Sequence, residues 1–274
     1  MNRRSFLTGL AAASWLRGAP AKCRIGITDW NLRMTVKPEA VATAARLGFD
    51  GIQISCGRQI ADNRMPLDNP QVIAAYLAAS KHNRIPIDGT CVDRLHDNGL
   101  KSDPLAAKWV SDAIRLTSAV GTRVLLVPFF GKWALTNRAE MDYTAGALRE
   151  LAPQAERAGV ILGLENTISA EDNVRIMEQS RSAAVQVYYD VGNSTTNGFD
   201  ILKEIRWLGR ERICQIHLKD RGMLGEGQIP FRDVMRAIAE IGFDGYANLE
   251  TGVRSAQTLE ADQKHNLEFI RGVM

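Results

Sequence analysis

The chain has 274 residues, with 45% hydrophobic and 24% charged residues and a formal net charge of +3. Three of its 34 basic residues and none of its 31 acidic residues lie in positions 1–21, so the rest of the chain is balanced in charge. That balance gives no reason to expect nucleic acid as a partner, and about 250 residues suit one large domain or two small ones.

The first 21 residues have the features of a cleaved twin-arginine export signal. Arg3 and Arg4 precede an apolar run, Phe6–Leu16, which is too short for a stable membrane anchor, and Ala19-Pro-Ala21 offers a small-residue cleavage site. We therefore expect the twin-arginine export machinery as a partner, and a periplasmic or secreted protein that begins at Lys22.

From residue 24 onward, short apolar runs alternate with helical patterns. Short continuous apolar runs are typical of parallel strands that are covered on both faces. The expected strands are Arg24–Trp30, Gly51–Cys56, Pro86–Val92, Arg123–Phe130, Val160–Thr167, Val185–Val191, Cys214–Lys219 and Tyr246–Thr251.

Glycine marks the expected end of three helices in this alternation. Gly48, Gly159 and Gly242 each close a helical pattern immediately before the next strand, and glycine readily adopts the left-handed conformation that ends a helix. Eight such units without a linker favour a single (β/α)8 barrel over residues 22–274. An open doubly wound sheet is the alternative, but the chain has neither a Gly-x-Gly-x-x-Gly nor a Walker-type phosphate loop to favour it.

Four of the expected strands end in a residue that can bind a metal ion. Glu165, Asp190, His217 and Glu250 follow one another at spacings of 25, 27 and 33 residues, roughly one strand and one helix each. In a barrel, the carboxyl ends of the strands form the active-site face, so these four side chains should converge. Because converging buried carboxylates need a counter-charge, we expect a divalent metal there. Three carboxylates and one imidazole favour Mn²⁺ or Mg²⁺, with Co²⁺ or Zn²⁺ as alternatives.

The order of these motifs resembles the xylose isomerase-like superfamily of barrels, which contains sugar isomerases and epimerases. The resemblance covers nearly all of residues 22–274 and is carried by Leu-Glu165-Asn, Asp190-Val-Gly-Asn193, His217-Leu-Lys-Asp220, Gly225-Glu-Gly and Leu-Glu250. It implies that Glu165, Asp190, His217 and Glu250 are metal ligands and that the two glutamates also act as acid and base.

The chemistry that this resemblance implies is proton transfer next to a carbonyl. A metal that chelates a carbonyl and its neighbouring hydroxyl stabilises the enediolate formed when the intervening proton leaves. Two carboxylates on opposite faces can then remove and return a proton, which inverts the carbon. The sequence does not indicate whether Glu165 or Glu250 acts first.

The chain departs from two groups within the superfamily. Many ketose 3-epimerases have a histidine three residues after the metal-binding aspartate, where this chain has Asn193, which can form hydrogen bonds but cannot carry a proton. The endonuclease IV repair enzymes need a histidine-rich zinc cluster, whereas this chain has four histidines, two of them in helical patterns.

Further candidates for substrate binding follow the expected strands. Lys219 alternates in phase with His217 and should point inward, and Arg221 is a candidate anchor for a carboxylate or hydroxyl. The complete set of predicted substrate-binding residues is Asn193, Lys219, Arg221, His96, Trp30 and Trp133.

The sequence therefore predicts a metal-dependent isomerase or epimerase of a small carbohydrate, a sugar or keto-sugar. Two alternatives stay open: a lyase that cleaves 3-keto-glycosides by β-elimination at the same site, and a sugar-binding barrel without turnover. The sequence also leaves open which sugar is bound, and whether the protein is a monomer or a homo-oligomer.

Overall fold

The computed structural model describes residues 23–274, so the predicted export signal lies outside the described residues. Eight parallel strands close into one barrel in chain order, which confirms the barrel and rules out the open sheet. The strands are β1 (Arg24–Thr28), β2 (Gly51–Ser55), β3 (Ile87–Cys91), β4 (Val124–Pro128), β5 (Ile161–Glu165), β6 (Val185–Asp190), β7 (Ile213–Leu218) and β8 (Tyr246–Leu249).

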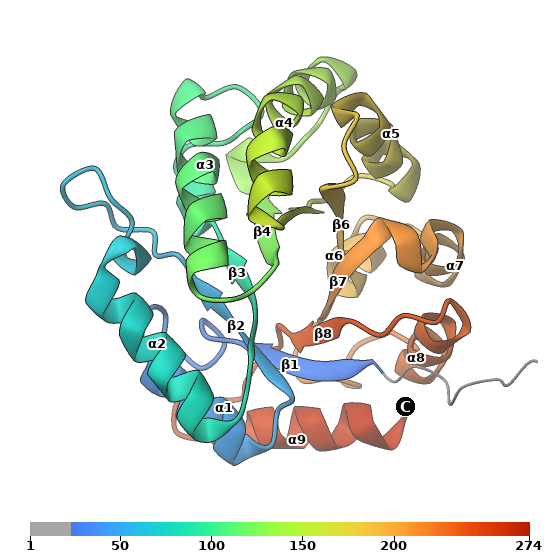
Figure 1. Cartoon of the computed structure of the whole chain (residues 1–274). Helices are drawn as coiled ribbons and strands as arrows, with labels where there is room; N and C mark the ends of the chain where they lie inside the picture. The colour runs from blue at the N-terminus through green and yellow to red at the C-terminus, as the bar shows by residue number, and fades with distance from the viewer. Residues whose placement is uncertain (1–22) are drawn as a thin grey trace, which may run out of the picture.

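Helices surround the barrel on its outside, as Figure 1 shows. The α-helices are α1 (Glu39–Leu47), α2 (Pro70–Asn83), α3 (Pro104–Ala119), α4 (Arg138–Ala158), α5 (Ala170–Ser180), α6 (Val191–Thr196), α7 (Ile201–Arg212), α8 (Phe231–Glu240) and α9 (Leu259–Gly272). Three short 3-10 helices lie in the loops: η1 (Pro66–Asp68), η2 (Asp93–His96) and η3 (Gly131–Trp133).

The expected glycine turns are present. Gly48, Gly159 and Gly242 all have positive φ, at 93°, 66° and 67°, and follow the ends of α1, α4 and α8. Left-handed backbone at these positions turns the chain back towards the barrel, where the next strand begins. The sequence thus predicted these helix ends to within one or two residues.

Closure of the barrel pairs its first strand with its last. β1 pairs with β8 through Arg24 and Tyr246, and the guanidinium of Arg24 also lies 4.0 Å from the centre of the Tyr246 ring. Outside the barrel, the Arg46 guanidinium on α1 binds both carboxylate oxygens of Glu260 on α9, at 2.7 and 2.8 Å.

Most of the core is apolar, but the barrel interior also contains a buried polar layer. Gln53, Asp88, Tyr188, Gln215 and Asn248 lie on five different strands, and none is more than 6% exposed. These side chains lie within the barrel, and two of them, Gln53 and Tyr188, contact His217 directly. Among residues 23–274, no helix combines the length and apolarity needed to cross a membrane.

Candidate metal centre

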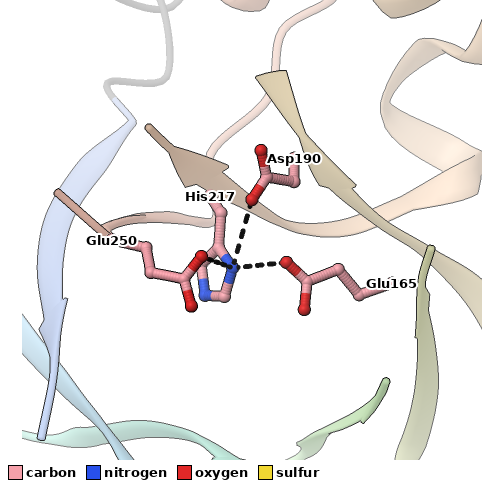
Figure 2. Close-up of side chains that lie close together, drawn as sticks. All are labelled: Glu165, Asp190, His217 and Glu250. Atoms are coloured by element: carbon pink, nitrogen blue, oxygen red, sulfur yellow. Dashed lines mark hydrogen bonds and ion pairs between the residues drawn. The ribbon is translucent and has the colours of Figure 1, made fainter. Parts of the chain in front are cut away.

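The four predicted metal ligands lie together at the carboxyl ends of consecutive strands. Glu165 and Asp190 are the last residues of β5 and β6, His217 is the penultimate residue of β7, and Glu250 directly follows β8. One ligand atom from each lies within 4.8 Å of the others, and Figure 2 shows all four side chains pointing to one place. Glu165, Asp190 and His217 are buried, while Glu250 is only partly covered.

Nδ1 of His217 lies at the centre of this cluster. It is 2.8 Å from Oε1 of Glu165, 3.8 Å from Oε2 of Glu250 and 3.9 Å from Oδ2 of Asp190. These contacts are the dashed lines in Figure 2. The atom of the ring that faces the carboxylates is therefore Nδ1, and Nε2 points down into the barrel.

Hydrogen bonds below the ring fix which nitrogen carries the proton. The Asn248 amide donates to the Tyr188 hydroxyl at 3.2 Å, and that hydroxyl donates to the side-chain oxygen of Gln53 at 3.0 Å. The same Gln53 oxygen lies 2.9 Å from Nε2 of His217 and can only accept a hydrogen bond. Nε2 must therefore donate, so Nδ1 is the ring nitrogen that faces the cluster, and the proton it directs at Glu165, 2.8 Å away, is the one that a bound cation would replace.

A buried carboxyl group begins this chain of hydrogen bonds. Oδ1 of Asp88 accepts from the Asn248 amide at 3.0 Å, and the backbone oxygen of Asp88 accepts from the Gln215 amide at 2.7 Å. Asp88 accordingly orients Asn248, which orients Tyr188 and, through it, Gln53. Burial, partly offset by the two amide contacts, raises the pKa of Asp88 to about 7.

Only one of the two carboxylate oxygens of Asp190 accepts a hydrogen bond from the described residues. Its Oδ1 accepts the backbone N–H of Asn193 at 2.7 Å and so caps α6, whereas its buried Oδ2 has no hydrogen-bond partner within residues 23–274. Burial and then the nearby Glu165 carboxylate raise the pKa of Asp190 to about 8. An unpartnered carboxylate oxygen aimed at two other carboxylates is strongly unfavourable unless a cation lies between them.

The carboxylates of the cluster also shift the pKa of His217. Burial lowers its pKa, but the carboxylates of Glu165, Glu250 and Asp190 outweigh burial and raise the pKa to about 9. Three carboxylates and one imidazole nitrogen around a single point match the ligand preferences of Mn²⁺ and Mg²⁺, with Co²⁺ and Zn²⁺ as alternatives. The donor set therefore fits a divalent cation.

Glu250 differs from Glu165 in how its oxygens are held. The Trp30 indole N–H donates to Oε1 of Glu250 at 2.9 Å, and the Lys219 ammonium donates to Oε2 at 2.7 Å. Although burial raises the pKa of Glu250, the charges of His217 and Lys219 outweigh it and give a net lowering. Glu165 has no comparable partner on Oε2 within the described residues, so this oxygen is free to meet a ligand.

A cavity of about 380 Å³ opens above the four ligands. Among the predicted substrate-binding residues, Trp30, His96, Asn193 and Lys219 line it, and the His96 ring stacks on Phe130 with ring centres 6.3 Å apart. Arg221 lines a second, neighbouring cavity.

Trp133 occupies a different place from the other predicted binding residues. It is not among the described residues that line either cavity, and its ring packs on Gly99, where an added Cβ would lie 2.3 Å from the ring. The prediction that Trp133 contacts a sugar therefore has no support from the geometry of these two cavities.

Residues 41–273 match the xylose isomerase-like TIM barrel family. The chain belongs to this family. A curated relative, 2-epi-5-epi-valiolone 7-phosphate 2-epimerase of an Actinoplanes species, is 29% identical over 228 residues, which are 79% of this chain and 82% of the relative. D-psicose 3-epimerase of Enterocloster bolteae is 26% identical over 240 residues, which are 80% and 77% of the two chains.

Solved structures share the fold of this family member at low sequence identity. D-psicose 3-epimerase from Clostridium cellulolyticum aligns with a TM-score of 0.77 at 20% identity, covering 91% of this chain and 99% of the other. The 3-keto-D-glucoside 4-epimerase of E. coli aligns with a TM-score of 0.74 at 19% identity, covering 92% and 100%.

Two charged residues in this xylose isomerase-like barrel escaped the sequence analysis. Arg58 follows β2 and Asp93 follows β3, and both line the cavity above the four ligands. The Arg58 guanidinium binds both oxygens of Asp97, and Asp93 accepts a hydrogen bond from Ser55 at 2.7 Å. Their positions just beyond strand ends, which singled out Glu250, would also have indicated these two residues.

Proposed function

We propose that this chain is a divalent-metal-dependent isomerase or epimerase of a sugar or keto-sugar, acting by proton transfer next to a carbonyl. The observation that carries the proposal is the pair Glu165 and Glu250, two carboxylates that belong to one buried four-residue cluster and line one cavity. The two curated relatives described above are both named as epimerases, which supports the same class of reaction.

The proposed metal ligands are Glu165, Asp190, His217 and Glu250. When bound there, a divalent cation polarises a carbonyl oxygen and stabilises the negative charge that develops as the adjacent C–H bond is broken. Oδ2 of Asp190 has no hydrogen-bond partner among the described residues, and Nδ1 of His217 faces the three carboxylates of the cluster.

The two glutamates would share the proton transfer. Oε2 of Glu165, free of hydrogen bonds within residues 23–274, would remove the proton from the carbon next to the carbonyl. Glu250, protonated from solvent, would return a proton to the other face, and Glu165 would give its proton to solvent to complete the cycle. The Lys219 ammonium, 2.7 Å from Oε2 of Glu250, would hold that carboxyl group in place. Removal on one face and return on the other inverts the carbon.

Three side chains of the cavity would orient the sugar. The side-chain amide of Asn193 has a buried Nδ2 with no partner in the described chain, so it is a donor for a substrate oxygen. The rings of Trp30 and His96 lie in the cavity wall and offer faces against which the C–H surface of a sugar packs.

The test is a product analysis with Glu165→Gln as the matched inactive variant. Purified protein with added Mn²⁺ is incubated with a panel of ketoses and 3-keto-glycosides in ²H₂O. An epimerase gives a product with deuterium at the inverted carbon, and an isomerase gives a product with deuterium at the former carbonyl carbon. The carbon skeleton is unchanged in both cases, and Glu165→Gln gives neither product. A released aglycone would instead identify the lyase, and tight sugar binding without deuterium uptake on any substrate would identify a binding protein.

We further propose that residues 1–21 direct the mature protein to the periplasm or the outside of the cell. Arg3, Arg4 and the apolar run that follows them support this proposal. Free sugars and glycosides are the substrates expected in that location.

A further inference from the structure

A second cavity, of about 530 Å³, adjoins the metal centre, and we propose that it binds an anionic substituent of the substrate, a phosphate or a carboxylate. This proposal rests on the proposed function, because it names the class of sugar on which the metal centre acts. The cavity is lined by residues of α6 and of the loop after β7. The helix α6 also contacts β7 itself. Asn193 and Lys219 line both cavities, so the two spaces meet at these side chains.

Two side chains of the second cavity, Asn193 and Arg221, have hydrogen-bond donors without a partner among the described residues. The Arg221 guanidinium makes no ion pair or hydrogen bond with any residue in 23–274, although its backbone N–H donates to Asp220. The buried Nδ2 of Asn193 also has no partner in that range. A guanidinium presents several N–H groups in a plane, which is the geometry that phosphate and carboxylate groups accept in pairs.

The carboxylate of Asp220 does not compete with a bound anion for these donors. Its Oδ1 accepts the Arg221 N–H at 2.8 Å, and its Oδ2 accepts the N–H groups of Gly225 and Gly227, both at 3.1 Å. Asp220 therefore shapes the loop from 220 to 227 and holds Arg221 at the cavity. A side chain at 227 would not fit, because its Cβ would lie 1.7 Å from Oδ1 of Asp220.

Lys219 contributes little positive charge to the second cavity. Its ammonium is committed to Glu250 at 2.7 Å and lies 3.8 Å from Asp190, on the side of the metal centre. Arg221 is thus the cation that a ligand in the second cavity would meet. A neutral sugar leaves that guanidinium in water, whereas an anionic substituent pairs with it.

Continuity between the cavities explains how one substrate would use both. Gly192 allows α6 to pack directly on Lys219, since a Cβ at this position would lie 2.9 Å from the Lys219 Cβ. The close approach places Asn193, the next residue, at the boundary of the two spaces. A sugar whose reacting carbon faces Glu165 would pass Asn193 and extend its substituent towards Arg221.

The experiment measures anion binding by the mature protein without requiring turnover. Inorganic phosphate and D-glucuronate are titrated separately into the wild type, Arg221→Ala and the control Arg157→Ala, which removes an exposed arginine from α4, and binding is followed by calorimetry. We expect at least one anion to bind the wild type and the control equally, and Arg221→Ala to weaken that binding about tenfold to a hundredfold. Anion held only by a cation at the metal centre would be insensitive to Arg221→Ala.

The outcomes separate the two anions and the two proposals. Binding of phosphate alone or of glucuronate alone identifies the substituent. Equal binding by the wild type and Arg221→Ala, or no binding of either anion, overturns the subsite. Arg221-dependent binding together with no turnover on any sugar would leave the subsite standing and refute the proposed function. If the subsite and the proposed function are both correct, Arg221→Ala should raise KM for the anionic substrate and leave kcat nearly unchanged.

Discussion

The side-chain oxygen of Gln53 lies 2.9 Å from Nε2 of His217 and so holds the imidazole with Nδ1 facing the three carboxylates. Gln53 is completely buried and lies on β2, which carries none of the four proposed ligands. A residue that touches none of the carboxylates thereby determines how the only nitrogen ligand is presented.

Replacing Gln53 should accordingly weaken metal binding. Gln53→Leu removes the acceptor for the Nε2 proton, and we expect a loss of about 10- to 100-fold in Mn²⁺ affinity, measured by calorimetry. Gln53→Glu keeps an acceptor oxygen and should restore most of that affinity. In zinc-loaded wild type, ¹⁵N spectra should show the proton on Nε2 of His217. Equal affinity in Gln53→Leu and the exposed control Gln59→Leu would contradict this role.

Asp190→Asn should change stability in opposite directions with and without metal. In EDTA, the substitution removes one of three crowded carboxylates and supplies an amide donor for the unpartnered position, so the protein should be stabilised by about 1–3 kcal/mol. With saturating Mn²⁺ the order should reverse, because the wild type gains binding energy that the variant lacks. Thermal unfolding in the two buffers measures both effects, and destabilisation in EDTA would show that the carboxylates do not repel one another.

The convergence of the four proposed metal ligands was predictable from sequence because strand ends repeat in register. Glu165, Asp190, His217 and Glu250 each close a short apolar run, and a parallel barrel brings such ends to one face. The support below the centre was not predictable in the same way. Gln53 lies between two isoleucines in mid-strand, and only barrel closure decides that it points inward and meets a histidine 164 positions away. No feature of the sequence near Gln53 indicates such a contact.

Loop conformations were the second feature that could not be predicted from the sequence. Trp133 was predicted to face a sugar because it follows β4, yet its ring covers Gly99, a contact that depends on how two loops fold against each other. The predicted strands extended one or two residues beyond the observed ends, since residues after a strand, such as Val92 and Val191, continue the apolar run.

Asp29 should make the protein less stable as pH rises through neutrality. Burial raises its pKa to about 8, and its buried Oδ1 has no hydrogen-bond partner among residues 23–274. An unfolded aspartate ionises near pH 4, whereas the folded one stays protonated, so stability falls by about 1.4 kcal/mol per pH unit between about pH 4 and pH 8. Below that window both states are protonated and the contribution is constant.

Asp29→Asn isolates this effect from the other carboxyl groups. The amide keeps an oxygen to accept the N–H groups of Val36 and Ser55, which Oδ2 accepts at 3.1 Å each. The gain in unfolding free energy of the variant over the wild type should grow from pH 5 to pH 7, as measured in urea. A difference that does not change with pH would show that Asp29 is ionised in the folded protein.

Lys219→Met should separate catalysis from metal binding. Loss of the ammonium leaves Oε2 of Glu250 without its 2.7 Å partner, and we expect kcat to fall about 100-fold or more. Metal affinity should stay the same or increase, because a positive charge next to the cation has been removed. Steady-state kinetics and Mn²⁺ titration test the two parts, and a parallel loss of both would make Lys219 a structural support of the centre.

The export segment should be separable from the barrel. Within the described residues, the barrel begins at Arg24, and the pairing of β1 with β8 uses residues from Arg24 onward. We expect the protein that lacks residues 1–21 to keep its fold, metal content and activity while it stays in the cytoplasm. Changing Arg3 and Arg4 together to lysine should block export of the full chain and leave the purified protein unchanged. Cell fractionation and sequencing of the mature N-terminus measure this, with Lys22 as the expected first residue. An uncleaved native protein in the cytoplasm would refute export, and phosphorylated sugars of the cytoplasm would then become the first substrates to test.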